Sequence, residues 1–516
     1  MNGAQSLLHT LVGAGVEVCF ANPGTSEMHF LAALDDVEQV RGVLGLAEGV
    51  VTGAADGYGR MAGRPAATLL HLGPGMANGL ANLHNARRAF TPLVNVVGDH
   101  ALHHKRFDAP LESDIDAAAG TVSGWVRRSK DSASVGADAA EAVAAASSPP
   151  GQVATLVLPA DVSWSDGGQV APPVVAAEPR QVPAETVAAV AEAVASGEAT
   201  VLLGGAACRE RGVLAASRIA EATGVQVLVE TVPARLERGE GLPNFRRLAY
   251  LGESAVEQLA GRRHLVLAGA RSPVSFFAYP GKPSDLVPDG TQVHVLATGT
   301  DDIAAALEAV ADEVAAGVEP QRTPAARPEL PSGELTLRNW ADVIGALLPP
   351  DAIVCDETNT SGTGLPKATA GAPRHDWLAL TGGAIGQGLP LAVGAAVACP
   401  DRPVLALEAD GSAMYTIQAL WTMAREQLDV TTVILSNRAY AILRMELMRV
   451  GAEAGGPTTD ALLDLSGPDL DFVSLATGMG VPATRAATAE ELAEQLSAAL
   501  EEPGPHLIEA LVPPLL

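Results

Sequence analysis

The sequence predicts an α/β protein with three doubly wound domains, each built around a parallel β-sheet. At 516 residues the chain exceeds one ordinary domain, and roughly 150 residues per domain predict about three. Two proline-rich stretches, residues 166–185 and 318–335, have neither helical nor strand periodicity and are therefore expected to be linkers. Elsewhere short apolar runs alternate with longer amphipathic stretches, as in parallel strands covered by helices. The predicted domains are residues 1–165, 186–317 and 336–516.

The apolar runs are short and rich in β-branched residues, so we expect each of them to be a buried strand. The first domain has four such runs, at residues 16–21, 40–46, 66–70 and 92–98. The middle domain also has four, at residues 200–205, 225–230, 264–269 and 292–297. The last domain has three, at residues 352–356, 404–409 and 430–437.

Composition and charge exclude several classes of partner. The chain has 60 acidic and 33 basic side chains, a formal net charge of −27. An acidic surface repels nucleic-acid phosphates and anionic lipid headgroups, so we expect neither nucleic-acid nor membrane binding. No apolar stretch is long enough to cross a bilayer, and the amino terminus lacks the features of a secretion signal. The four cysteines are widely spaced without a CxxC pair, which favours a reducing cytoplasm.

Polar residues follow each of the four predicted strands of the first domain. Thr25 and Ser26 follow the first, Glu48 the second, His71 the third and His100 the fourth. Each has a structural explanation when taken alone, such as a helix-capping hydroxyl or a first-turn glutamate favoured by the helix dipole. Ligands of open α/β sheets bind beyond the carboxyl ends of the strands. Four such ends together therefore predict one polar site at this edge of the sheet.

Two strand ends in the last domain predict a metal and phosphate site. Residues 404–409 end at Asp410-Gly411-Ser412, and the next strand ends at Asn437. A right-handed βαβ crossover would bring Asp410 and Asn437 together, and their carboxylate and amide oxygens suit Mg²⁺. A helix beginning near Gly411 and Ser412 would offer backbone N–H groups to a phosphate. The alternative is that Asp410 only caps this helix and Asn437 only forms a turn.

Several motifs give the chain a resemblance to a known superfamily. The motifs are NPGTSE, LAEGVVTGAADGYGRMAG, TGGAIG and DGSAMYTIQALW, and the last continues through a strand to NRAY. With them the chain resembles the thiamine-diphosphate-dependent 2-oxo acid decarboxylases and acetolactate synthases, and it most resembles the benzoylformate decarboxylases among them. The middle domain matches least. The resemblance implies a pyrimidine-binding first domain, a central α/β domain and a diphosphate-binding last domain.

The resemblance also implies three catalytic residues in the first domain. Glu48 would hydrogen-bond the aminopyrimidine ring of the cofactor and promote its imino tautomer. His71 would relay protons to the reacting substrate. Thr25 falls where the benzoylformate decarboxylases have a serine that contacts the substrate.

The cofactor would be held by the last domain. The resemblance implies that Asp410, Asn437 and the backbone carbonyl of Ala439 bind Mg²⁺ against the diphosphate. Gly411 and Ser412 would donate hydrogen bonds to that diphosphate. The remaining residues expected along the cofactor are Ile385, which would force it into a bent shape, and Thr358, Asn359, Thr360, Gly383 and Tyr440.

The sequence departs from the family pattern around the substrate. The second pocket histidine of the benzoylformate decarboxylases has no counterpart, and the best match is Phe277. His103 and His104 resemble the paired histidines of the pyruvate decarboxylases. The alternative interpretation, a solvated pair in a loop, is equally well supported. With His100, these residues are our candidates for the substrate pocket. Ala409 also replaces the first glycine of the cofactor motif.

The resemblance implies thiamine-diphosphate- and Mg²⁺-dependent decarboxylation of a small 2-oxo acid to an aldehyde. One alternative is a carboligase of the acetolactate synthase type. Typical synthases carry FAD in the middle domain, but the glycines after residues 200–203 are a weak dinucleotide signal, so FAD is not favoured here. A distant alternative is a non-catalytic regulatory protein that binds the cofactor. The family architecture implies a homodimer at the least, and we expect a homotetramer, with Glu48 of one subunit facing the cofactor of another.

Overall fold

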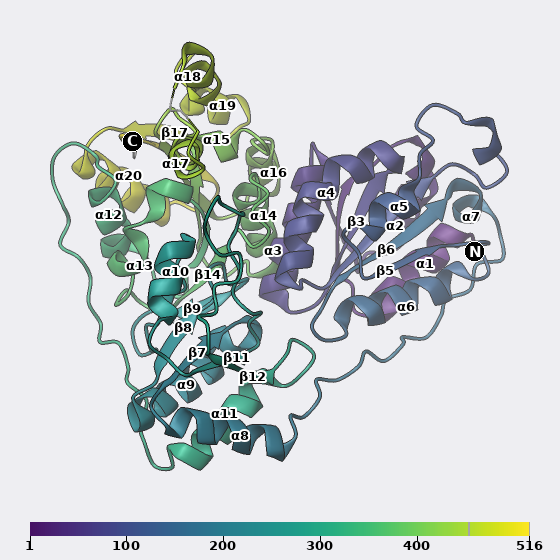
Figure 1. Ribbon diagram of the computed structural model, residues 1–516. Helices are drawn as coiled ribbons and strands as arrows, with labels where there is room; N and C mark the ends of the chain where they lie inside the picture. Colours follow the sequence, from purple (N-terminus) through teal and green to yellow (C-terminus); the bar gives the residue numbers. More distant parts are fainter. Residues whose placement is uncertain (453–454, 515–516) are drawn as a thin grey trace.

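A computed structural model describes residues 1–452 and 455–514, and it contains three sheets that succeed one another along the chain. Figure 1 shows the first domain in purple and blue, the middle domain in teal, and the last domain in green and yellow. Long irregular connections join the domains (Figure 1). The predicted fold class, three domains built on parallel sheets, is confirmed.

The first domain has a six-stranded parallel sheet in the order β2-β1-β3-β4-β6-β5. Its central strands are buried on both faces, which is why they read as continuous apolar runs. The strands are β1 (Val18–Asn22), β2 (Arg41–Leu44), β3 (Ala66–His71), β4 (Leu93–Asp99), β5 (Trp125–Arg128) and β6 (Val153–Pro159). The helices are α1 (Gly3–Gly13), α2 (Met28–Asp35), α3 (Glu48–Ala62), α4 (Leu72–Ala89), α5 (Ile115–Gly120), α6 (Val135–Ser147) and α7 (Ala160–Trp164), with short 3-10 turns at Thr25–Glu27 and Lys105–Phe107.

The middle domain has a five-stranded parallel sheet in the order β10-β8-β7-β11-β12. All four predicted runs form strands of this sheet. The strands are β7 (Ala199–Leu203), β8 (Gln226–Val229), β10 (Arg246–Arg247), β11 (His264–Ala268) and β12 (Gln292–Ala297). The helices are α8 (Ala184–Ala195), α9 (Glu210–Thr223), α10 (Gly252–Leu259) and α11 (Ile303–Val314), with a 3-10 turn at Gly205–Cys208.

The last domain has a seven-stranded sheet in the order β17-β18-β16-β15-β13-β14-β9. The strands from its own segment are β13 (Ile353–Glu357), β14 (His375–Ala379), β15 (Val404–Ala409), β16 (Val430–Ser436), β17 (Ala483–Ala486) and β18 (His506–Leu511). The helices are α12 (Asn339–Leu347), α13 (Leu365–Ala368), α14 (Gly388–Ala398), α15 (Asp410–Ala413), α16 (Ala419–Glu426), α17 (Ala441–Arg449), α18 (Pro457–Leu463), α19 (Phe472–Gly478) and α20 (Ala489–Glu501), with a 3-10 turn at Asn359–Gly362.

Three features of the last domain differ from the prediction. Strands β14, β17 and β18 lie outside the three predicted runs. Strand β9 (Leu236–Arg238) comes from the middle segment of the chain and pairs antiparallel with β14, so the sheet is mixed at this edge. The helix expected from Gly411 onward is divided into α15 and α16. The break between α15 and α16 places Thr416 against the loop that precedes α14. There Thr416 Oγ1 donates to the carbonyl oxygen of Gly386 at 2.9 Å.

Helices α3 and α14 join the first domain to the last one, and they lie side by side in Figure 1. A Cβ atom added at Gly57 would lie 2.1 Å from the carbonyl oxygen of Leu391, and one added at Gly394 would lie 1.8 Å from that of Ala54. Real Cβ atoms do not approach backbone oxygens so closely. Glycine on both helices is therefore what allows the two backbones to touch.

A buried ion pair next to this crossing ties the two domains further. Asp56 and Arg60 lie one turn apart on α3, and their side chains are 0% and 2% exposed. Arg60 donates to the carbonyl oxygen of Ala379 at 2.8 Å and to Thr381 Oγ1 at 2.9 Å. Gln387 Nε2 in turn donates to Asp56 Oδ2 at 2.5 Å. Besides bonding to each other, the two charged side chains on α3 thus share three hydrogen bonds with the last domain.

The cysteines and helices also match the sequence expectations. All four cysteines are free, and burial raises the pKa of the Cys19 thiol to about 12, which leaves it unreactive. None of the helices within the described ranges is long and apolar enough to span a membrane.

We predict that Gly394→Ala will destabilise the contact between the first and last domains. The added methyl group must displace the Ala54 backbone, and overpacking of this kind costs about 1–3 kcal/mol or more. Urea unfolding measures the effect. Gly13→Ala is the control, because no heavy atom lies within 4 Å of its added Cβ. Equal unfolding midpoints for the two variants would contradict the close crossing.

Candidate active site

Glu48 is the first residue of α3 and is buried beneath the start of α4. The backbone of the preceding residue, Ala47, is extended, so Glu48 lies at the strand-to-helix junction that the sequence predicts. Glu48 Oε2 accepts a hydrogen bond from Asn78 Nδ2 at 3.1 Å. A Cβ atom at Gly75 would lie 3.2 Å from Glu48 Oε1, so α4 covers the carboxylate closely. Glu48 is 8% exposed.

His71 ends β3 and is oriented by a carboxylate that the sequence prediction missed. His71 Nδ1 lies 2.8 Å from Glu27 Oε2, and the Glu27 side chain is fully buried. The same oxygen accepts the backbone N–H of Gly24 at 2.8 Å. A Cβ atom at Gly24 would overlap the imidazole, so glycine is needed where the ring lies. With Nδ1 donating to Glu27, Nε2 is left as the acceptor that a ligand can meet.

Thr25 and Ser26 lie in the 3-10 turn that leads to Glu27. Ser26 Oγ is 3.4 Å from His71 Nδ1 and also hydrogen-bonds Glu27, whereas Thr25 is exposed. The structure thus brings Ser26 closer to His71 than Thr25, and the role of Thr25 in substrate contact stays a prediction. Glu27 could have been suspected from the NPGTSE motif, in which a carboxylate follows the hydroxyl residues directly.

Asp410 and Asn437 come together at the carboxyl ends of two adjacent strands. Strands β15 and β16 pair in parallel up to Ala409 and Leu435. Asp410 Oδ2 accepts the backbone N–H of Arg438 at 2.6 Å, and Asn437 Oδ1 accepts that of Ala439 at 2.9 Å. The βαβ geometry predicted from the sequence therefore places both side chains at one edge.

A glycine-rich segment, residues 382–388, crosses the same edge and carries Ile385. Gly383 and Gly386 have φ values of +74° and +91°, a region that favours glycine. Helix α4 of the first domain holds the segment through two asparagines. Asn85 Nδ2 donates to the carbonyl oxygen of Ala384 at 2.8 Å, and Asn82 Nδ2 donates to that of Gly386 at 3.2 Å. The sequence prediction missed both, although amides inside a helix are unfavourable without such partners.

Comparisons with known proteins identify the family. Residues 1–119 match the family described as "Thiamine pyrophosphate enzyme, N-terminal TPP binding domain", and residues 363–510 match its "C-terminal TPP binding domain". Along 100% of both chains, the protein is 64% identical to a Mycobacterium tuberculosis protein named "Putative acetolactate synthase large subunit IlvX". The chain belongs to the thiamine pyrophosphate enzymes. Thiamine pyrophosphate is thiamine diphosphate under another name.

More distant relatives agree with this family. A benzoylformate decarboxylase from Pseudomonas aeruginosa is 30% identical over 96% of each chain. The structure of a thiamine diphosphate-dependent 4-hydroxybenzoylformate decarboxylase from Rhodococcus jostii superposes with a TM-score of 0.87 over 99% of each chain, at 24% identity. An enzyme from Mycobacterium smegmatis described as thiamin diphosphate-dependent superposes with a TM-score of 0.83 over 100% of each chain, at 26% identity.

The residues around Asp410 fit a diphosphate bound through Mg²⁺. A carboxylate, an amide oxygen and the carbonyl of Ala439 are hard oxygen donors, and Mg²⁺ completes its shell with phosphate and water. Burial raises the pKa of the Asp410 carboxyl, against the backbone N–H groups that lower it, and a divalent cation would favour its charged form. The ring of Tyr440 lies on Gly411, where a Cβ atom would come within 2.5 Å of it. No cluster of three or more His, Cys, Asp or Glu ligands occurs in residues 1–452 and 455–514.

The loop after β13 lies beside this diphosphate site. Asn359 has a φ of +49°, and its Nδ2 donates to Ser412 Oγ at 2.9 Å. Thr358 is buried and hydrogen-bonded to Asp356 Oδ1 through both its N–H and its hydroxyl. Thr360 is half-buried in the same turn. These residues therefore surround the position predicted for thiamine diphosphate, and their contacts with it stay predictions.

The candidate residues for the substrate pocket lie mostly on the surface of the single chain. His103 and His104 are exposed, and His103 Nδ1 lies 3.5 Å from Asp161. His100 Nε2 contacts the carbonyl oxygen of Pro110 at 3.1 Å. Phe277 is 54% exposed. Its neighbour Phe276 contacts the glycine-rich segment instead. A Cβ atom added at Gly383 would lie 2.6 Å from the Phe276 ring. The pocket roles of these residues stay predictions.

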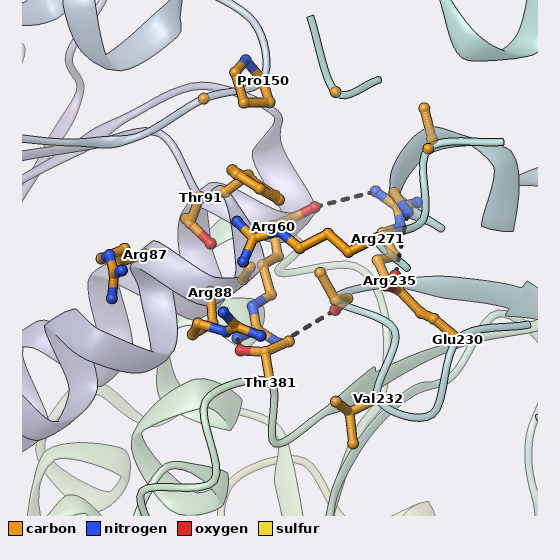
Figure 2. Close-up of a pocket in the computed structure, with 18 of the residues that line it drawn as sticks. Arg60, Arg87, Arg88, Thr91, Pro150, Glu230, Val232, Arg235, Arg271 and Thr381 are labelled. Atoms are coloured by element: carbon orange, nitrogen blue, oxygen red, sulfur yellow. Dashed lines mark hydrogen bonds between the residues drawn. The ribbon is translucent and has the colours of Figure 1, made fainter. Parts of the chain in front are cut away.

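A cavity of about 790 Å³ lies between the first and middle domains, reaches Thr381 and Gly382 of the last domain, and is rich in arginine. Figure 2 shows Arg60 and Arg88 of the first domain opposite Arg235, Arg271 and Glu230 of the middle domain. Burial lowers the pKa of Arg88, and neighbouring arginines lower it further. Burial also raises the pKa of Glu230 to about 7. We name this space the arginine cavity. The sequence did not reveal it, because its residues come from distant segments.

We predict that Asp410→Ala will abolish Mg²⁺-dependent binding of thiamine diphosphate. The loss should exceed the roughly 10- to 100-fold that removing a partner of a metal ligand typically costs. Calorimetric titration of the cofactor with and without Mg²⁺ measures it. Asp401→Ala is the control, because Asp401 is exposed at the opposite end of β15. Unchanged affinity in Asp410→Ala would refute the assignment.

Proposed function

We propose that the protein is a carboligase of the acetolactate synthase type that uses thiamine diphosphate and Mg²⁺. It would release carbon dioxide from one 2-oxo acid and join the remaining acyl unit to a second carbonyl compound. The observation that carries this proposal is the 64% identity, along the whole chain, with the M. tuberculosis protein named "Putative acetolactate synthase large subunit IlvX". The sequence motifs alone favour simple decarboxylation, so this identity changes the preferred reaction.

Glu48 has the position that proton transfer to the cofactor requires. When bound, thiamine diphosphate supplies a sink for the electron pair left behind as carbon dioxide departs from a 2-oxo acid. Glu48 would accept and return a proton at its carboxylate, which is buried and has Asn78 as its one side-chain donor among the described residues. A buried carboxyl group with few partners is suited to such exchange.

His71 is the second proton-transfer group. Glu27 holds its Nδ1, so that Nε2 can take a proton from the substrate or return one to it. The imidazole is partly exposed, with 23% of its side chain accessible, whereas Glu27 is not accessible at all. Solvent and substrate can therefore reach the histidine but not the group that orients it.

The family resemblance favours a dimer as the smallest active unit, because it implies that Glu48 faces a cofactor held by another subunit. We infer that Glu48 of one protomer faces the diphosphate site of its partner, in a homodimer or homotetramer. The small 2-oxo acid would then bind between the two protomers.

A second candidate function is decarboxylation of a 2-oxo acid to an aldehyde. The pairing of His71 with Glu27 favours it, because releasing an aldehyde requires a proton donor at the reacting carbon. The 30% identity with the P. aeruginosa benzoylformate decarboxylase also supports it. The two candidates differ in their product, since only the carboligase consumes an acceptor.

The arginine cavity bears on whether FAD is a second cofactor. Gly205, Glu230 and Gly269 line the cavity at the carboxyl ends of three parallel middle-domain strands, the usual position of ligands on such sheets. Arg88 and Arg271 could hold the diphosphate of a dinucleotide there. The reaction proposed here transfers no electrons to a flavin, so FAD would have a structural role.

We predict that Glu48→Gln will stop turnover while sparing cofactor binding. The amide cannot accept and return the proton, and loss of such a group typically costs about 10²- to 10⁴-fold in rate. Turnover and calorimetric affinity for thiamine diphosphate are measured on the same preparation. Glu38→Gln, on the exposed surface of the same domain, should behave like the unmodified protein. Full activity in Glu48→Gln would remove this residue from the mechanism.

The reaction itself is tested with a panel of 2-oxo acids, thiamine diphosphate and Mg²⁺, with and without a second carbonyl compound. We expect carbon dioxide release to rise with the acceptor and the product to contain both carbon skeletons. Free aldehyde equal to the carbon dioxide released, in the presence of acceptor, would instead establish the decarboxylase. The visible absorbance of the same samples reports bound flavin.

A further inference from the structure

Glu357 lies beneath both loops that are expected to hold the cofactor. It is the last residue of β13 and is 2% exposed. Its Oε1 accepts the backbone N–H of Gly386 at 2.7 Å, and its Oε2 accepts that of Gly388 at 2.5 Å. One carboxylate therefore holds two amides of the glycine-rich segment, on either side of Gln387. Ile385 directly precedes the first of them.

The same carboxylate also meets the loop that is expected to bind the diphosphate. Burial raises the pKa of Glu357 to about 7, against the amides of the glycine-rich segment and the hydroxyl of Ser412, which lower it. Ser412 follows Gly411 in the turn after β15. Glu357 is thus hydrogen-bonded to the segment that carries Ile385 and lies beside the turn at Ser412.

A neighbouring buried carboxyl group makes no comparable contact. Glu408 pairs with Glu357 across β13 and β15, and it is fully buried. Neither of its carboxyl oxygens has a hydrogen-bond partner in the part of the chain that the structure describes. A Cβ atom at Gly388 would lie 2.0 Å from Glu408 Oε2, so this side chain fills space under the segment without holding its amides.

We propose that Glu357 is a positioning residue that fixes the glycine-rich segment to the carboxyl end of β13. By holding the amides of Gly386 and Gly388 it sets where Ile385 stands relative to the cofactor. This inference rests on the proposed use of thiamine diphosphate. It adds a residue that touches neither substrate nor cofactor and acts through Ile385.

The test compares Glu357→Gln with Glu408→Gln. Both changes keep the size of the side chain, but only the first replaces an oxygen that accepts a backbone amide. We expect Glu357→Gln to weaken binding of thiamine diphosphate at least about tenfold, as loss of a buried hydrogen bond does, and Glu408→Gln to leave it unchanged. Equal affinities for Glu357→Gln and the unmodified protein would overturn the proposal.

A double-mutant cycle tests whether Glu357 acts through Ile385. Glu357→Gln, Ile385→Ala and the double variant are compared by calorimetric affinity for thiamine diphosphate and by kcat at saturating cofactor. If Ile385 transmits the effect, the double variant will be only as impaired as Ile385→Ala. Additive losses would contradict transmission through Ile385. A purely structural role would lower the unfolding midpoint of the cofactor-free protein and leave the two losses additive.

Hydrogen exchange supplies a measurement that needs no cofactor. In the cofactor-free protein, the peptide covering residues 382–388 should exchange faster in Glu357→Gln than in Glu408→Gln. Equal exchange would overturn the proposal even if binding cannot be measured. Failure of the unmodified protein to bind thiamine diphosphate, with faster exchange in Glu357→Gln, would instead count against the proposed function and leave Glu357 as the residue that orders the segment.

Discussion

Helices α3 and α14 touch at their glycines, and this contact determines where both halves of the site stand. Helix α3 begins at Glu48, and α14 begins at Gly388, where the glycine-rich segment ends. The backbones of the two helices meet at Gly57 and Gly394. A shift of the first residue of α3 would therefore also shift the first residue of α14. The ion pair of Asp56 with Arg60 reinforces the contact by bonding to the last domain. The start of α3 at Glu48 and the start of α14 at Gly388 are thus held in a fixed relation within the chain.

Charge is distributed unevenly over the molecule, and this distribution bears on how an anionic cofactor could bind. The chain carries a net charge of −27, yet a diphosphate is expected at Asp410. The groups expected to bind it there are neutral backbone N–H groups and a metal that brings its own charge, so no basic patch is needed. The arginines that do cluster line the arginine cavity, which is bounded by the first and middle domains and by Thr381 and Gly382. The site expected for the diphosphate does not use these arginines.

The sequence predicts those parts of the structure that depend on local pattern. Buried parallel strands read as apolar runs, and residues just after them, such as Glu48 and Asp410, fall at one edge of each sheet. The predicted runs still omit some apolar strands, such as the fully buried β6. The other features that the sequence misses depend on pairing between distant segments. Glu27 reaches His71 only because β1 and β3 are neighbours. Strand β9 has three residues and no apolar run, so nothing local indicates that it completes another domain's sheet.

The pair of Glu357 and Glu408 illustrates why tertiary register can hide a functional residue. In the sequence, β13 and β15 each show a single glutamate at or near the end of an apolar run. Such a glutamate is usually interpreted as a surface or capping residue. Only the register between β13 and β15 reveals that both are buried side by side, where an apolar side chain would cost less. For Glu357 the cost is offset by two backbone amides of the glycine-rich segment. A buried carboxylate that organises loops in this way stabilises one arrangement of the site at the expense of overall stability. The site, more than the fold, accounts for its presence.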